Sequence, residues 1–220
     1  MSYEFSLSSL VLGSPLRRRS PPLCPELELW LLGDDIDLNA RVSELFTIER
    51  APYWAFCWGS GQALARYLLD RPELVRGRVV ADFGAGSGVA ALAALRAGAT
   101  RAVAVDIDPC ALAAARANAE LNGLFLELAE QLPAEFDVLL ASDVLYELGN
   151  RDFLCSVSAA GKHVIVSDPL RAGNPRLALE PRARFDVCTL PDVDYPCSSS
   201  VVYELPPYAF GAEGIKQIDG

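Results

Sequence analysis

Residues 78–106 read RVVADFGAGSGVAALAALRAGATRAVAVD. A short apolar segment runs into three glycines at alternate positions, Gly84, Gly86 and Gly88, within what we call the glycine loop, residues 84–88. An alanine-rich segment with helical spacing follows, and a second apolar segment then ends in an acid. Short apolar runs rich in β-branched residues indicate buried strands, and glycine suits tight turns. The sequence therefore predicts a strand, the glycine loop, a helix and a second strand.

The same alternation continues through the chain. Strands separated by helices with short links imply a parallel sheet covered on both faces, because parallel neighbours need crossover connections. The last two predicted strands have no helix between them, which predicts an antiparallel pair that closes the sheet. The fold is therefore predicted to be α/β and doubly wound, with one reversed edge. The expected helices are 61–70, 89–97, 109–122 and 152–160, and the expected strands are 78–83, 102–106, 136–141, 163–167, 185–190 and 201–205.

Composition limits the kind of partner. The chain has 220 residues, 51% of them hydrophobic, and 29 acidic against 19 basic residues give a formal net charge of −10. This negative charge disfavours binding to nucleic-acid backbones and to anionic membranes, because a protein needs clustered Lys and Arg to bind either of them. The length favours one domain. We expect a flexible leader (about 1–20), N-terminal elements that pack on the ligand site (21–76) and an α/β core (77–220).

Cysteine usage and the N-terminus bear on location. No two cysteines have the C-x-x-C spacing typical of zinc or redox sites, so no metal is expected and all six are predicted to be reduced thiols. The apolar segment 7–12 precedes the basic cluster 17–19, the reverse of a secretory signal, and is too short to span a membrane. We expect a cytoplasmic location. The cysteines are Cys24, Cys57, Cys110, Cys155, Cys188 and Cys197.

Two kinds of ligand suit the glycine loop. Bare backbone with amide donors at a helix start suits a dinucleotide pyrophosphate. The dinucleotide pattern G-x-G-x-x-G fails when it starts at Gly84, because Val89 takes the place of its third glycine. The looser pattern G-x-G-x-x-A does fit when it starts at Gly86 and ends at Ala91, but it gives no role to Asp82 or Gly84. The second ligand is S-adenosylmethionine (SAM).

An acid closes the second strand. Asp106 follows the glycines by about 20 residues, and its carboxylate offers two acceptor oxygens to the vicinal hydroxyls of a ribose. Asp108 is better explained as the cap of the next helix, with Pro109 in its first turn. We therefore assign the ribose to Asp106 and the cap to Asp108.

The third long strand ends in Ser142-Asp143-Val144-Leu145-Tyr146. In open α/β sheets, ligands lie beyond the carboxyl ends of the strands. Asp143 and Tyr146 are therefore expected to face the transferred group.

These motifs resemble a known enzyme class. Asp82 followed by G-x-G-x-G resembles the first motif of class I, seven-strand methyltransferases, and D-x-x-Y at 143–146 resembles their family 16, which mostly modifies protein lysines. The segment PYWAFCWGSGQAL at 52–64 looks like the signature of the electron-transfer-flavoprotein β-subunit lysine methyltransferases and their bacterial relatives. The likeness runs from about Pro21 to Leu205.

The resemblance implies a Rossmann-like, doubly wound seven-stranded sheet, mostly parallel with an antiparallel C-terminal strand. It implies SAM as cofactor, S-adenosylhomocysteine (SAH) as product, and a protein substrate that presents a lysine. Two departures are Leu170, where relatives tend to have glycine, and a short connection from Asn122 to Phe136, which leaves the adenine contacts unassigned. The implied cofactor-binding residues are Trp58, Asp82, Gly84, Ala85, Gly86, Gly88, Asp106, Ile107 and Ser142, and the implied catalytic residues are Asp143 and Tyr146.

Some aromatic and histidine side chains could belong either to the ligand site or to the hydrophobic core. Phe56 is expected in the core, whereas Trp58 is assigned to the cofactor by the resemblance. His163, within an apolar strand, is expected to be a packed core histidine.

The two implied catalytic residues have different expected roles. Asp143 is expected to orient the lysine amine and to offset the positive charge that grows on it, while Tyr146 hydrogen-bonds or packs against the end of the lysine side chain.

Three alternatives remain open from the sequence. A methyltransferase of small-molecule amines would share every cofactor motif. A nicotinamide-dependent oxidoreductase would bind NADH, and a catalytically silent adaptor would bind the cofactor weakly and form a complex through its acidic surface. We expect no nucleic-acid partner and no membrane; the pattern does not fix the oligomeric state.

Overall fold

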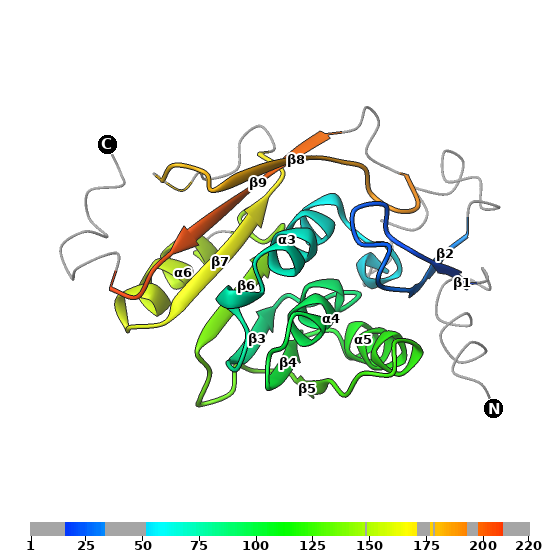
Figure 1. The fold of residues 1–220 in the computed structure, drawn as a ribbon, viewed down its shortest axis with the longest axis horizontal. Helices are drawn as coiled ribbons and strands as arrows, with labels where there is room; N and C mark the ends of the chain where they lie inside the picture. The colour runs from blue at the N-terminus through cyan, green and yellow to red at the C-terminus, as the bar shows by residue number, and fades with distance from the viewer. Residues whose placement is uncertain are drawn as a thin grey trace.

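A computed structural model describes residues 16–33, 52–147, 149–170, 177, 179–192 and 198–208 (Figure 1). The strands are β1 (Leu16–Arg19), β2 (Leu29–Leu32), β3 (Val79–Phe83), β4 (Arg101–Val105), β5 (Glu127–Ala129), β6 (Val138–Ser142), β7 (His163–Asp168), β8 (Ala183–Val187) and β9 (Ser198–Leu205). The α-helices are α3 (Gly59–Asp70), α4 (Val89–Arg96), α5 (Pro109–Leu121) and α6 (Asn150–Ala159), and two short 3₁₀ helices are η1 (Tyr53–Ala55) and η2 (Pro72–Leu74).

One seven-stranded sheet organises the molecule, with strand order β5-β4-β3-β6-β7-β9-β8. The five strands from β5 to β7 pair in parallel, and β9 pairs antiparallel with both β7 and β8. The predicted doubly wound, mostly parallel sheet with an antiparallel C-terminal strand is therefore confirmed. The reversed strand was expected at the edge, but β9 lies one place inside it, because β8 pairs on its outer side.

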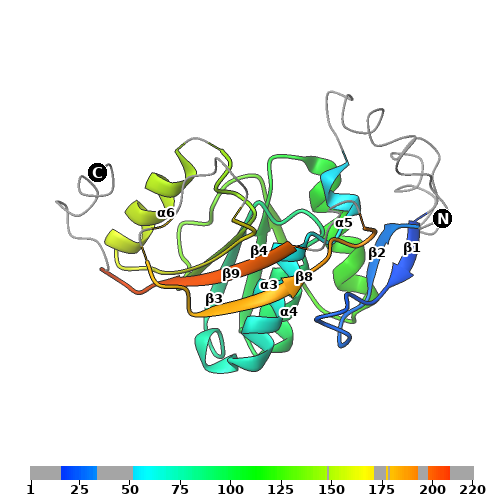
Figure 2. The same ribbon diagram turned by 90° about the horizontal axis from the view of Figure 1, so that it is seen from above.

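Helices cover both faces of the sheet (Figures 1 and 2), and alternate residues of the central strands pack in different apolar clusters. Val80 and Leu140 pack in one apolar cluster with α3, α4 and α5. Ala81 and Leu139 pack in a second cluster with α6. Because these strands are buried on both faces, they appear in the sequence as unbroken apolar runs. The parallel strands all end at one edge of the sheet, where the glycine loop and Asp143 also lie.

The predicted helices form for the expected local reasons. Helix α3 ends at Asp70, just before the proline that opens η2, since proline removes a backbone donor. Asp108 caps α5 by accepting a hydrogen bond from Cys110 N at 2.9 Å. Gly98 follows α4 with φ 100°, and Gly161 follows α6 with φ 90°; glycine adopts this left-handed conformation easily, so both helices end at these residues.

Three sequence predictions need correction. Residues 16–19 were expected in a flexible leader, but they form β1, which pairs antiparallel with β2, because this pairing buries Leu16. Strand β5 lies in the short connection after α5, where no strand pattern was seen. Cys188 is disulfide-bonded, so the prediction of reduced thiols is wrong there. The spacing rule tests only local pairs, so it missed this bond.

The remaining cysteines of the described segments are free thiols: Cys24, Cys57, Cys110 and Cys155. Burial raises the pKa of the Cys57 thiol well above its ordinary value. Cys197 and the predicted leader before residue 16 lie outside the described residues. Within the described segments, no helix has the length and apolar character needed to cross a membrane.

Candidate active site

The glycine loop joins β3 to α4. Gly84, Gly86 and Gly88 have φ angles of 70°, 51° and 80°, which cost other L-residues free energy. A Cβ at Gly84 would lie 3.1 Å from Val144 Cγ1, and one at Gly88 would lie 3.0 Å from Ala115 Cβ. A Cβ at Gly86 would meet no atom within 4 Å. The loop is therefore tightly packed at both ends and open at Gly86, where a ligand can approach the backbone.

Several N–H groups of the loop are already used within the protein. Gly84 N and Ala85 N donate to Val105 O at 2.9 and 3.1 Å, and Gly88 N donates to Ala85 O at 2.7 Å. These three N–H groups therefore already have acceptors within the protein. A pyrophosphate needs N–H donors, whereas a cationic ligand is stabilised by carbonyl oxygens. With these donors engaged, the loop has fewer free N–H groups for a pyrophosphate than its sequence suggests.

Asp106 lies just beyond β4 and is hydrogen-bonded to the backbone of the glycine loop. Its Oδ2 accepts from Gly86 N at 2.9 Å, and its Oδ1 accepts from Asp108 N at 3.0 Å. Each carboxylate oxygen has a second lone pair, so a ribose diol can still donate to both. The next side chain, Ile107, is 90% exposed at the same edge of the sheet.

Asp82 is a buried acid that is hydrogen-bonded to the helix following the glycine loop. It is buried in β3, and its Oδ2 accepts from Ala91 N at 3.0 Å, in the first turn of α4. Burial raises the pKa of Asp82 to about 7; the hydrogen bond from Ala91 opposes this shift, and the negative charge of Asp106 adds to it. Asp82 therefore fixes the start of α4 behind the glycine loop.

The acceptor loop, residues 143–147, follows β6. Asp143 has φ 54°, a left-handed conformation that is strained for a residue other than glycine, asparagine or aspartate. Its N–H donates to Ser167 O at 3.0 Å. Val144 and Leu145 are buried, and Asn150 Nδ2 donates to Val144 O at 2.8 Å. Because Val144 also packs against Gly84, the acceptor loop and the glycine loop are in contact.

Tyr146 stands outward from the acceptor loop. Its side chain is 63% exposed. Partial burial raises the pKa of Tyr146, and the negative charges of Asp143, Glu147 and Asp106 raise it further. Charges of both predicted cofactor and predicted acceptor residues therefore lie near enough to affect Tyr146.

An aromatic group lies before α3. Trp58 Nε1 donates to Tyr53 O at 2.9 Å, and the Trp58 ring centroid lies 6.0 Å from that of Tyr53 and 5.5 Å from that of Phe56. Phe56 is fully buried, which confirms its predicted place in the core. Tyr53 is 54% exposed, and its negative charge, when it is ionised, would raise the pKa of Tyr146. Tyr53 was not predicted at the site, since its only signal in the sequence is its position in the aromatic segment 52–64.

The first turn of α3 approaches the end of β6. A Cβ at Gly61 would lie 3.0 Å from Val89 Cγ1 and 3.7 Å from Ser142 Oγ. The glycine therefore allows α3, α4 and the carboxyl end of β6 to meet closely. This contact brings Trp58, which precedes α3, and Ser142, which ends β6, to the same side of the molecule as the two loops.

Curated relatives match nearly the whole chain. The electron transfer flavoprotein beta subunit lysine methyltransferase of Xenopus laevis is 37% identical over 204 residues, covering 86% of this chain and 82% of the relative. The Danio rerio protein of the same name is 38% identical over 216 residues, covering 91% and 83%. The chain belongs to this methyltransferase family.

Two further comparisons concern the catalytic core. The family model of ribosomal protein L11 methyltransferase (PrmA) matches residues 59–167 of the methyltransferase, a range that holds both loops. The solved structure of the T. thermophilus 16S rRNA N2 G1207 methyltransferase with AdoMet and guanosine has a TM-score of 0.52 and 19% identity, covering 86% of this chain and 50% of that one. This second likeness shows the shared fold.

The predicted family, enzyme class and cofactor are confirmed: the protein is a class I, SAM-dependent methyltransferase. The nicotinamide-dependent alternative is excluded by the family. The roles of individual residues stay predictions, because the comparisons do not test them.

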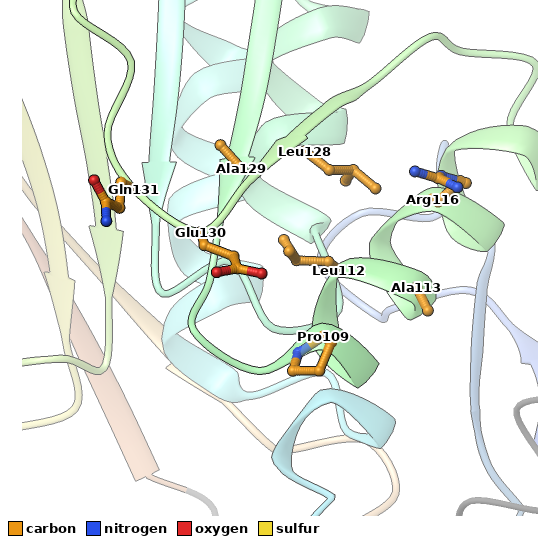
Figure 3. A pocket seen from close by; sticks show the side chains of 8 residues that line it. All are labelled: Pro109, Leu112, Ala113, Arg116, Leu128, Ala129, Glu130 and Gln131. Atoms are coloured by element: carbon orange, nitrogen blue, oxygen red, sulfur yellow. The ribbon is translucent and has the colours of Figure 1, made fainter.

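A cavity of about 660 Å³ lies between α5 and the end of β5 (Figure 3). In Figure 3, the side chains of Pro109, Leu112 and Glu130 converge on it. None of the predicted site residues lines this cavity. Its lining includes Pro109, close in sequence to Asp106 and Ile107, and residues of β5, which lies in the connection for which the adenine contacts were left unassigned.

Proposed function

We propose that the methyltransferase transfers methyl groups from SAM to a lysine side chain of a protein, and that the electron transfer flavoprotein β subunit is its substrate. The contact between Gly84 and Val144 carries this proposal, because the loop that we expect to hold the methyl donor touches the acceptor loop. The names of the relatives support the substrate.

The residues present fit SAM. Gly86 leaves open space over the loop, and Asp106 keeps acceptor capacity for the ribose hydroxyls. The carbonyl oxygens of the loop suit the positive charges of the methionine part. Trp58, Ile107 and Ser142 would border the cofactor, and Ala85 and Gly88 would hold the loop around it. When bound, SAM supplies an electrophilic methyl group on a sulfonium.

The acceptor loop would prepare the lysine. A lysine has an ordinary pKa of about 10.4, so its amine must lose a proton before it can act as a nucleophile. The Asp143 carboxylate would orient the amine and offset the positive charge that grows on nitrogen. Tyr146 and Tyr53 would pack along the lysine side chain and exclude water. Alignment of donor and acceptor can contribute about 7–11 kcal/mol to the rate.

A direct assay tests the substrate. The purified enzyme is incubated with labelled SAM and the electron transfer flavoprotein β subunit from the same genome, and lysine methylation is mapped by mass spectrometry. We expect methylated lysine with the unaltered enzyme and none above background with Asp143→Asn. A label that appears only in a fraction of small amines, or only in added RNA, would contradict the proposal.

The cytoplasmic location stays a proposal. The free thiols of Cys24 and Cys57 agree with a reducing compartment, whereas the disulfide of Cys188 does not. Fractionation of cells that express the full chain tests it.

A further inference from the structure

Asn118 connects the glycine loop to the N-terminal hairpin, which consists of β1 and β2. It lies on α5 and is fully buried. Its Oδ1 accepts from Trp30 N of β2 at 2.7 Å, and its Nδ2 donates to Ser87 O of the glycine loop at 2.8 Å. One buried amide therefore bonds at the same time to two segments that are far apart in the sequence.

The bond to Ser87 fixes one peptide unit of the loop. The carbonyl of the Ser87–Gly88 peptide accepts from Asn118, and its N–H donates to Ala85 O at 2.7 Å. Both ends of this peptide are therefore held. On the other side of the loop, Asp106 holds Gly86 N at 2.9 Å. Because glycines have many allowed backbone conformations, a loop of this composition needs such bonds to keep one shape.

We propose that Asn118 is a positioning residue: it holds the glycine loop in the shape that binds the cofactor and couples that loop to the N-terminal hairpin. The inference rests on the proposed placement of SAM on this loop. If the coupling exists, it is reciprocal, so cofactor binding stabilises β2 as much as an intact β2 favours cofactor binding.

Asn122 provides a matched control one turn further along α5. Its Oδ1 accepts from Glu28 N at 3.0 Å, and its Nδ2 donates to Glu28 O at 2.6 Å and to Asn118 O at 2.7 Å. It therefore also attaches the chain leading into β2, but none of its hydrogen bonds reaches the glycine loop.

Two substitutions separate the two bonds of Asn118. Asn118→Asp keeps an acceptor for Trp30 N but replaces the donor to Ser87 O with an oxygen, which would repel that carbonyl. Asn118→Ala removes both bonds without burying a charge, and alanine suits this alanine-rich helix. The second variant keeps the test decisive if the first does not fold, and circular dichroism checks both.

The test measures SAH binding by calorimetry and hydrogen exchange of the backbone amides of β2. We expect Asn118→Asp and Asn118→Ala to raise the Kd for SAH about ten-fold or more, the scale of one lost buried hydrogen bond, and Asn122→Ala to change it less than about two-fold. In the unaltered enzyme SAH should slow exchange at residues 29–32, and in both Asn118 variants it should not. In turnover, the KM for SAM should rise more than kcat falls.

Three results would overturn the inference. Folded Asn118 variants that bind SAH as well as the unaltered enzyme would remove Asn118 from the cofactor site. An equal loss in Asn122→Ala would show that attachment of the hairpin alone matters. If the unaltered enzyme bound no SAH, or Asp106→Ala left binding unchanged, the proposed cofactor site itself would fail, and the role of Asn118 with it.

Discussion

The cofactor side and the acceptor side of the active site are built differently. The predicted cofactor side comes mainly from one continuous stretch, residues 82–108, with Trp58 and Ser142 added from other elements. Hydrogen bonds to Asp82 and Asp106 hold the backbone of this stretch. The acceptor side combines η1 with the loop after β6, and its two tyrosines, Tyr53 and Tyr146, are 54% and 63% exposed. The predicted cofactor side is therefore fixed mainly by local backbone structure, whereas the predicted acceptor side depends on exposed side chains from segments far apart in the sequence.

The largest expected effect is on the acceptor side. Asp143→Asn should lower kcat by about 100-fold or more, because the amide cannot offset the charge that develops on the amine. Asparagine tolerates the left-handed backbone at φ 54°, so the fold should be kept. The Kd for SAH should change less than about two-fold. Asp143→Ala should show the same loss of turnover with some added backbone strain; unchanged turnover in both variants would remove Asp143 from the mechanism.

The next effect concerns stability on the cofactor side. The pKa of Asp82 is raised to about 7 in the folded protein, against about 3.9 in an unfolded chain. Between these values the folded state holds a proton that the unfolded state has lost. The free energy of unfolding should therefore fall as pH rises, by up to ~1.4 kcal/mol per pH unit. Urea unfolding from about pH 4 to pH 7 should show this slope, and Asp82→Asn should abolish it.

Glu204 on β9 supplies a control of opposite sign. His163 Nε2 lies 3.2 Å from its Oε2, and the Tyr67 hydroxyl donates to its Oε1. These contacts lower the pKa of Glu204 to about 2. Its stabilising contribution is present above its ordinary pKa and is lost as pH falls toward 2. Glu204→Gln should remove only this acid-side loss; a slope near neutrality that persisted in Asp82→Asn would show that another group titrates there.

A smaller effect is expected from closing the open part of the glycine loop. Gly86→Ala and Gly77→Ala both place a Cβ where no atom lies within 4 Å, at φ 51° and 74°. Each should cost about 1 kcal/mol of stability through backbone strain. Calorimetry should show about ten-fold weaker SAH binding for Gly86→Ala alone, because its Cβ enters the space proposed for the cofactor. Equal SAH affinity in the two variants would place the cofactor elsewhere.

The same contrast explains how much of the molecule the sequence predicted. The glycine loop, Asp106 beyond β4 and the cap at Asp108 follow from local rules, because their backbone conformations depend on neighbouring residues. His163 was predicted in the core and is buried. Leu170 has φ 54°, a backbone conformation that favours glycine, and glycine is the residue that the resemblance leads us to expect at this position.

The features that the sequence did not predict depend on distant partners. β1 exists only through its pairing with β2, and the three-residue β5 through its pairing with β4. Asn118 is one polar residue in an alanine-rich helix, and nothing local marks the two segments that its amide joins. Tyr53 lies in the same aromatic segment as Phe56, which is a core residue, so only the folded structure shows which of these side chains is exposed.

Tyr53 gives the smallest expected effect and the sharpest test of the contrast. Tyr53→Ala should raise the KM for the protein substrate about five-fold, since an exposed aromatic wall contributes about 1 kcal/mol to binding a cationic side chain. The backbone carbonyl that accepts from Trp58 is kept, so the Kd for SAH should stay unchanged. Phe125→Ala, at an aromatic side chain that is 81% exposed beyond α5, should alter neither constant. Weaker SAH binding in Tyr53→Ala would instead assign Tyr53 to the cofactor side through its ring contact with Trp58, and the two sides would then share one aromatic wall.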